Sequence, residues 1–424
     1  MMLQPGSKGW INKFFYLVEK NEIDTSFVRP KGLNEEHFVH LYLGQTGLNF
    51  GYASELLFCK NLDDTSWTSE EKLKLLLFES HYFVYLNFEK KSKISKEGFI
   101  ASMLDFYGRH NSYSIKKIFT FFIKEENDEK LEDILSKRVD IKVKLLDNRI
   151  WINSLSNVFV YLDVILYHDY LKSKNQQTFS NYNELATNAL IAITLAASSD
   201  GAIQETEKSM FKIFLASANL HEGDKEFVQN KFKKGARFED FTQVVFSNWM
   251  FKQFILDLSI LTIYSKNQTH IEEEQYLQTL CEYLKIPTQS FNESVLLIEK
   301  FVLQNNDKVS FLQSSSSYEK MYNSVSKHWL KILGRNKDKL AIELKQSKDL
   351  VFLIKKSATE DLTKDEKEIV KTQFLDIVKS MPSLAIFLLP GGAILLPLVL
   401  KIIPDLVPSA FRDNEIEKKN SKIN

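Results

Sequence analysis

The sequence predicts an all-α protein made of multi-helix bundle domains, with one hydrophobic, membrane-associated segment near the C-terminus. Apolar residues recur every three to four positions through most of the 424 residues, a spacing typical of amphipathic helices. Only 14 glycines and 8 prolines interrupt the pattern, and alternating stretches typical of strands are short. Residues 384–400 contain no charged side chain, and no other part of the chain is comparably apolar.

The composition narrows the classes of partner and compartment. Lys+Arg and Asp+Glu both total 55, so no overall charge favours DNA as a partner. Cys59 and Cys281 lie far apart in apolar patterns, which predicts buried, reduced thiols. The N-terminus lacks the apolar core and cleavage site of a secretory signal, so we expect the bulk of the chain to be cytoplasmic.

Changes in composition divide the chain into five parts. A helical domain is predicted at 1–172 and a second at 182–304, with a polar stretch between them. A polar and amphipathic connector at 305–339 leads to a helix plus hydrophobic segment at 340–412. The charged tail, 413–424, has the composition of a disordered segment.

The expected helices follow from apolar stripes and from two N-terminal signatures. Thr68-x-x-Glu71 and Thr363-x-x-Glu366 are capping boxes, each of which predicts the start of a helix. The second helix is predicted to end near Pro382. Its predicted apolar face comprises Ile369, Val370, Phe374, Ile377 and Val378. Other stripes predict helices within 115–123, 155–166, 185–197, 210–220, 254–264, 277–284 and 296–303.

An acidic turn in the second domain is the candidate metal site. Gly201 permits the positive φ of an Asp-Gly turn, and the helix dipole favours Glu205 and Glu207 in the first turn of the helix that follows. That account is complete without a ligand. Asp200, Glu205 and Glu207 nevertheless carry the carboxylates that a divalent cation prefers, so the sequence leaves a metal site open.

This turn resembles that of the TerB-like helical family, first described in tellurite-resistance proteins. The family's D-G-x-I-x-x-x-E pattern is matched by Asp200, Gly201, Ile203 and Glu207. Its second, related helix pair is best matched at 266–286, although without the Asp-Gly. The resemblance implies a TerB-like domain and, through the family's connection with metal ions, the divalent cation considered above.

The apolar run at 384–400 is the main functional signal. As one helix it would reach roughly 25 Å, slightly less than a hydrocarbon core of about 30 Å. The sequence favours membrane insertion, as a single pass or as a re-entrant segment bent at Pro390-Gly391-Gly392, over a buried core hairpin with the same bend. Basic residues flank both ends and select no orientation, and the re-entrant form is preferred. Membrane lipid is therefore an expected partner.

The same region is similar to the leucine-zipper and EF-hand-containing transmembrane (LETM) family. The family shares an L-T-x-x-E helix and an L-L-P-x-x-x-K-x-x-P-x-x-x-P-S-x-F segment. With Leu384, Pro390, Gly391 and Gly392, the predicted membrane-segment residues are Leu396, Pro397, Lys401, Pro404, Pro408 and Phe411.

The resemblance identifies the chain as a LETM-related bacterial protein. Known members lie in the mitochondrial inner membrane and are associated with exchange of K⁺ or Ca²⁺ against protons and with docking of ribosomes. In those proteins the ribosome-binding part continues after the membrane segment, whereas this sequence ends twelve residues after Arg412. We therefore expect most of that part to be lacking, and no EF-hand loop is present in the sequence.

No catalytic constellation is recognisable in the sequence, so we expect no enzyme activity and no bound cofactor. The glycine-rich stretch at 44–51 lacks the Gly-Lys-Ser/Thr ending of a phosphate-binding loop, which favours a turn or close helix packing. His37 and His40 have no accompanying H-E-x-x-H or cysteine pattern, which disfavours zinc.

Two functional hypotheses remain. The first is a membrane-anchored helical interaction or scaffold protein that docks ribosomes at the membrane, with any other protein partner unidentified. The alternative is a component of cation/proton transport or ion homeostasis. A single chain makes no ion path through 384–400, because that run contains no ionisable group. Oligomers around the Pro390-Gly391-Gly392 bend stay open as a path.

Overall fold

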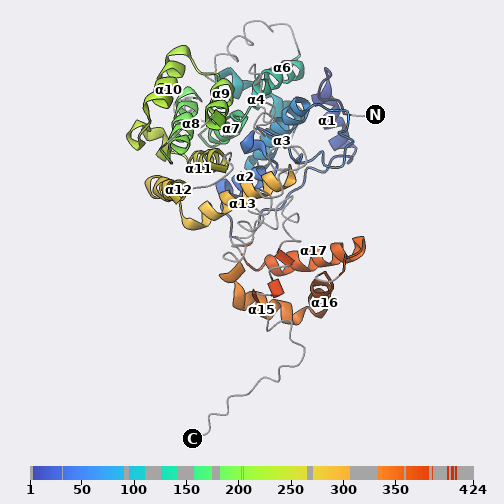
Figure 1. Cartoon of the computed structure of the whole chain (residues 1–424). Helices are drawn as coiled ribbons and strands as arrows, with labels where there is room; N and C mark the ends of the chain where they lie inside the picture. The colour runs from blue at the N-terminus through green and yellow to red at the C-terminus, as the bar shows by residue number, and fades with distance from the viewer. Residues whose placement is uncertain are drawn as a thin grey trace. The chain divides into compact units, whose positions relative to one another are not determined.

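The computed structural model confirms the all-α class for the part of the chain that it describes (Figure 1). No strand occurs among these residues. The described residues are 3–30, 32–89, 95–109, 126–140, 157–173, 182–201, 203, 205–264, 271–305, 333–357, 360–381, 384, 399–400, 403–404 and 406–407.

The chain forms two compact units. The first contains Met1–Arg29 and Asn34–Tyr318, and the second contains Pro30–Leu33 and Glu319–Asn424. The α-helices of the first unit are α1 (Trp10–Glu19), α2 (Glu35–Gly44), α3 (Ser69–Glu89), α4 (Lys96–Arg109), α6 (Asn127–Val139), α7 (Val160–Ser173), α8 (Tyr182–Ala197), α9 (Glu205–Ala218), α10 (Glu222–Lys234), α11 (Trp249–Tyr264), α12 (Ile271–Leu284) and α13 (Thr288–Gln304). Short 3₁₀ helices are η1 (Leu48–Phe50), η3 (Phe238–Asp240) and η4 (Gln243–Phe246).

Aromatic side chains form the core where α1 meets α3 and α4. Phe14 and Phe15 on α1 meet Phe78 and Tyr82 on α3 edge to face, with ring centroids 5.1 to 6.0 Å apart. Such pairs add to the free energy gained by apolar burial. The backbone amides of Gly9 and Ile11 donate to the Glu132 carboxylate at 3.0 and 2.9 Å, so α6 caps the start of α1.

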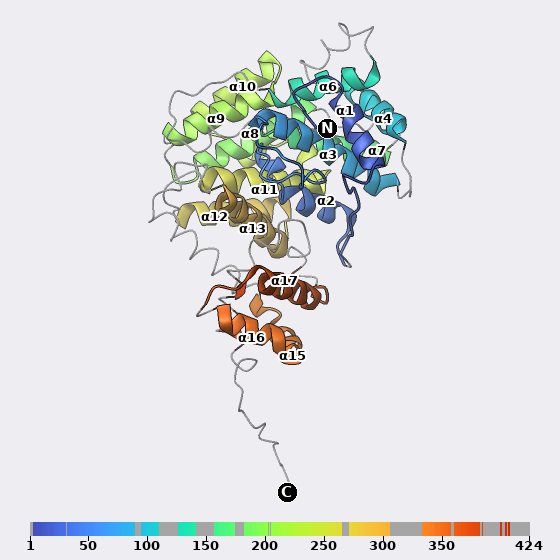
Figure 2. The same ribbon diagram turned by 90° about the vertical axis from the view of Figure 1, so that its right-hand side faces the viewer.

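The middle of the first unit is built on α8 and α11, which pack along one another (Figures 1 and 2). Both helices are buried on nearly all sides, which requires neighbours all around them. On α8 these neighbours include α9 and α10, and on α11 they include α12 and α13. The acidic turn enters α9 through Gly201, whose φ of +87° confirms the predicted positive-φ turn.

Helix α2 joins the two predicted helical domains. It contacts α11 and α13, and its residues from Phe38 to Gly44 are buried. A Cβ added to Gly44 would lie 2.7 Å from a Leu297 methyl carbon, so this glycine serves close helix packing. The predicted domains at 1–172 and 182–304 therefore lie within one compact unit.

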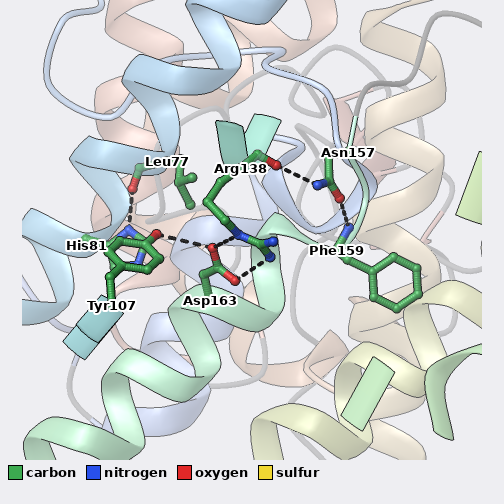
Figure 3. A network of polar contacts seen from close by, with 7 residues as sticks. All are labelled: Leu77, His81, Tyr107, Arg138, Asn157, Phe159 and Asp163. Carbon is green, nitrogen blue, oxygen red and sulfur yellow. Dashed lines mark hydrogen bonds and ion pairs between the residues drawn. The ribbon is translucent and has the colours of Figure 1, made fainter. Parts of the chain in front are cut away.

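A buried ion pair connects α6 and α7 (Figure 3). The Arg138 guanidinium donates from Nε to Asp163 Oδ2 at 2.6 Å and from Nη2 to Oδ1 at 2.7 Å. The side chains are 1% and 0% exposed. Tyr107 also donates to Asp163 at 3.2 Å, and Asn157 donates to the Arg138 carbonyl at 2.5 Å. These hydrogen bonds offset the cost of burying two charges.

A second buried polar cluster lies where α2, η1, α7 and α11 meet. Asn49 donates to Asp257 Oδ2 at 2.8 Å, and His40 Nε2 lies 3.4 Å from the same oxygen. His40 Nδ1 lies 2.9 Å from the Tyr161 hydroxyl. Burial raises the pKa of Asp257 to about 7, although hydrogen bonds from Ser294 and Asn49 oppose the rise. Burial and the nearby charge of His37 lower the pKa of His40 to about 3.

The second unit contains α15 (Lys337–Gln346), α16 (Lys348–Ser357) and α17 (Lys364–Val378). These helices pack on one another (Figure 1). Apolar side chains are buried between them. The buried residues include Leu340, Leu344, Leu350, Ile354, Val370, Phe374 and Val378. The break between the two units, after Tyr318, falls within the predicted connector at 305–339.

The described helices agree with most of the apolar stripes. The capping box at Thr68 is present, because Thr68 N donates to Glu71 Oε2 at 2.7 Å and Glu71 N donates to Thr68 Oγ1 at 3.1 Å. Helices α7, α8, α9, α11, α12 and α13 cover the stripes predicted from 155 to 303, with shifts of several residues at some ends. The stripe at 115–123 and the tail at 413–424 lie outside the described residues.

Candidate interaction surface at the C-terminus

Helix α17 begins at the predicted capping box. Thr363 N donates to Glu366 Oε2 at 2.9 Å, and Glu366 N donates to Thr363 Oγ1 at 3.3 Å. This reciprocal pair satisfies two backbone donors that a helix start leaves open. The helix ends at Val378, a few residues before the predicted end at Pro382.

Polar contacts fix α17 against the other two helices. Lys356 on α16 donates to Glu366 Oε1 at 2.7 Å, and Ser347 donates to the Gln373 side chain at 3.0 Å. The Lys356 hydrogen bond lowers the pKa of Glu366, together with the backbone amide of Thr363. Lys339 on α15 donates to the Ser380 carbonyl at 2.5 Å, just beyond the C-terminal end of α17. These contacts therefore fix the positions of the three helices, and of their exposed faces, relative to one another.

Each of these helices carries one exposed large apolar side chain. Ile342 on α15 is 58% exposed, Phe352 on α16 is 64% exposed and Ile369 on α17 is 44% exposed. Ile342 and Phe352 lie opposite the buried stripes of their helices, which is the sequence signal that marks them. Ile369 was predicted on the apolar face of α17. That prediction is wrong, because Ile369 lies about 100° from Val370, on the side away from Phe374.

Lysines on α17 follow a helical spacing that places them on another face. Lys364, Lys367 and Lys371 are separated by three and four residues, so their side chains project from one stripe. Lys364 and Lys367 are exposed, and neither forms an ion pair with a described residue. Lys371 pairs with Glu368 at 3.0 Å. This stripe can approach a surface rich in phosphates.

Only the ends of the apolar run are described, and the side chains there are buried. Leu384, Val399 and Ile403 are each fully buried, Leu400 is 7% exposed, and the following Val407 is 1% exposed. Pro404 is half-buried. The other predicted membrane-segment residues lie outside the described residues: Pro390, Gly391, Gly392, Leu396, Pro397, Lys401, Pro408 and Phe411.

Across the described ranges, no helix combines the length and apolar character needed to cross a bilayer. Burial of the ends of 384–400 agrees with one feature of the core hairpin that the sequence left open. It agrees equally with a segment whose two ends are held by the protein.

The acidic turn does not bring its three carboxylates together. Glu205 lies at the surface, its side chain 86% exposed, and pairs with Lys208 at 2.6 Å. Glu207 is fully buried, because two positions along a helix correspond to a rotation of roughly 200°. Asp200 is half-buried in the preceding turn. Within the described residues, no group of three or more His, Cys, Asp or Glu side chains is placed to hold a metal ion.

Two parts of the chain match known families. Residues 162–294 match the family described as protein of unknown function DUF533, which is consistent with a TerB-like middle region. Residues 362–424 match the family described as LETM1-like, RBD, the ribosome-binding domain. No curated protein and no solved structure matches the chain. The C-terminal part, comprising α17, the apolar run and the tail, is thus similar to the LETM1-like ribosome-binding domain.

Proposed function

We propose that this protein is a non-catalytic docking protein whose C-terminal unit binds ribosomes. The match of residues 362–424 to the LETM1-like ribosome-binding domain is the single observation that carries the proposal. The described part of that match includes α17, where the capping box and the Lys356–Glu366 contact position the lysine stripe.

The distribution of charge supports a polyanionic partner for this unit. Glu319–Asn424 contains 19 Lys and Arg against 14 Asp and Glu, whereas the rest of the chain contains 36 against 41. A zero total therefore conceals a basic C-terminal part. Ribosomal RNA presents a dense array of phosphates, which attracts exposed lysines such as Lys364 and Lys367.

We further propose that the apolar run places this unit at a membrane as a re-entrant segment. Leu384 and Val399 are both buried, and both belong to the same compact unit. A spanning helix would separate the two ends by a hydrocarbon core of about 30 Å, on opposite sides of the bilayer. A re-entrant segment returns to the side on which it started, and it leaves both ends within one unit.

Ion transport has less support than docking. A path for cations needs polar or ionisable groups at bilayer depth, and residues 384–400 contain no ionisable group. We therefore retain docking as the proposed function.

Ribosome binding can be measured by co-sedimentation of the full chain with purified ribosomes through a sucrose cushion. We expect Lys364→Gln combined with Lys367→Gln to weaken binding by roughly ten- to thirtyfold, because each lysine near a dense array of phosphates contributes on the order of 1 kcal/mol. Binding of the unaltered chain should also weaken steeply as salt is raised.

The matched control removes an equal number of positive charges, two, from the first unit. Lys20→Gln combined with Lys234→Gln, at two exposed positions, should leave co-sedimentation unchanged. Equal loss in both double variants would show that only total charge matters, against a specific role for α17. Failure of the unaltered chain to pellet with ribosomes at low salt would overturn ribosome docking itself.

A further inference from the structure

A cavity of about 410 Å³ lies between α9 and α10 in the first unit, apart from the surface considered above. Both helices lie beside α8 in the two views (Figures 1 and 2). Its lining includes the apolar residues Phe211, Leu215 and Phe232 and the lysines Lys208, Lys212 and Lys233. A volume of this size is within the usual range for small-molecule sites.

The spacing of these residues explains why they face one space. Positions 208, 211, 212 and 215 follow the three- and four-residue steps of a single helical stripe on α9. The core face of α9 is a different stripe, with Met210, Phe214 and Ala218 fully buried. Helix α9 therefore has a second stripe, in which apolar residues alternate with lysines. A stripe that only packed against another helix would carry apolar residues at all of these positions.

The apolar part of the cavity is built around two stacked rings. Phe211 and Phe232 have centroids 3.8 Å apart and planes 14° apart. Phe211 is 4% exposed, while Phe232 and Leu215 are half-buried, so part of this apolar surface is open to a ligand. Covering it would be favoured by the hydrophobic effect.

The charged part of the cavity is cationic. Lys208 already holds the Glu205 carboxylate at 2.6 Å. That hydrogen bond, together with the charges of Lys208 and Lys212, lowers the pKa of Glu205, as expected in a positive local field. Lys212 and Lys233 are exposed, and no described residue forms an ion pair with either. Two cations thus remain for an anionic ligand.

We infer that the cavity binds a small anionic amphiphile, a carboxylate carrying an apolar chain. The chain lies against Phe211, Phe232 and Leu215, and the carboxylate lies at Lys212 and Lys233. An uncharged hydrocarbon would gain nothing from the charges of the two lysines, and a bare anion would leave the apolar surface exposed to water. An amphiphile satisfies both halves of the cavity.

The inference can be tested by isothermal titration calorimetry of the full chain with dodecanoate below its micelle concentration. Three control ligands each lack one of its two parts: dodecanol has the apolar chain without the charge, and acetate and inorganic phosphate have the charge without the chain. We expect saturable binding of dodecanoate at one site, at least tenfold tighter than that of any of the other three. Equal binding of dodecanol would refute the role of the lysines, and equal binding of acetate or phosphate would refute the apolar contact.

Variants place the binding at this cavity. Lys212→Gln combined with Lys233→Gln should weaken dodecanoate binding at least tenfold while leaving the melting temperature unchanged, because both side chains are at the surface. Lys225→Gln combined with Lys234→Gln removes two charges from the same helix region outside the cavity and should leave binding unchanged. Unaltered affinity in the first variant overturns the inference. So does tighter binding by an acidic, phenylalanine-containing peptide, which would indicate a protein partner instead.

Discussion

Asp163→Asn is expected to lower the free energy of unfolding by about 3–5 kcal/mol, because it removes the carboxylate from a buried ion pair. Arg138 is 1% exposed, and both of its described ion-pair contacts are to the Asp163 carboxylate (Figure 3). An asparagine of nearly the same shape would place an uncharged amide against the guanidinium. Chemical denaturation followed by circular dichroism measures the loss.

The chain offers a matched control for this substitution. Asp105 pairs with Arg109 at 2.7 Å, but their side chains are 44% and 38% exposed, so solvent screens the pair. Asp105→Asn should therefore cost less than about 1 kcal/mol. A similar loss for the two variants would show that burial does not set the importance of the α6–α7 pair.

The free energy of unfolding of the Asp257→Asn variant, minus that of the unaltered chain, is expected to increase as pH rises from 4 to 7. Burial raises the pKa of folded Asp257 from 3.8 to about 7, so between these values the folded state binds more protons than the unfolded state. The stability of the unaltered chain then falls with rising pH through this window and is level above it. The asparagine variant lacks this proton, and the difference should grow by roughly 4 kcal/mol across the window.

His40 must be included in that experiment, because it titrates beside Asp257. Its pKa is lowered to about 3, so its contribution to stability is present above pH 6.5 and is lost as pH falls. This contribution has the opposite sign, and the substitution at Asp257 itself changes it, because His40 Nε2 lies 3.4 Å from the Asp257 carboxylate. Both proteins therefore carry His40→Gln in the experiment, which removes the histidine from their difference. Denaturation curves of the two proteins at pH 4, 5, 6 and 7.5 measure that difference. A constant difference would mean that Asp257 is ionised across the whole range.

Local sequence signals predict where the helices begin and end, but they do not predict the tertiary contacts between helices. The capping boxes at Thr68 and Thr363 specify their own hydrogen bonds, because both partners lie within three residues. The buried polar clusters have no such local signal. Asp163 and Asp257 lie on apolar helices, and their partners Arg138 and Asn49 lie 25 and 208 residues away.

The candidate sites show the same division. The LETM-like similarity could be recognised from the order of residues alone, because its proline spacing is distinctive. The exposure of Ile369 could not be predicted, because the sequence of α17 does not show which of its apolar residues the other helices cover. The structure buries Val370 and Phe374 and leaves Ile369 exposed. Lys208 and Lys212 interrupt an apolar stripe in the sequence, but only the approach of α10 makes them part of the lining of a cavity.

Docking of ribosomes to a membrane is tested most directly by vesicle flotation. The full chain is reconstituted into phospholipid vesicles, mixed with ribosomes and centrifuged through a density gradient. We expect ribosomes to float with vesicles that carry the protein. Leu388→Asp combined with Leu395→Asp, which introduces two charges into the apolar run, should prevent flotation of the protein itself. Protein that floats without ribosomes would contradict docking, and protein that never floats would contradict membrane attachment.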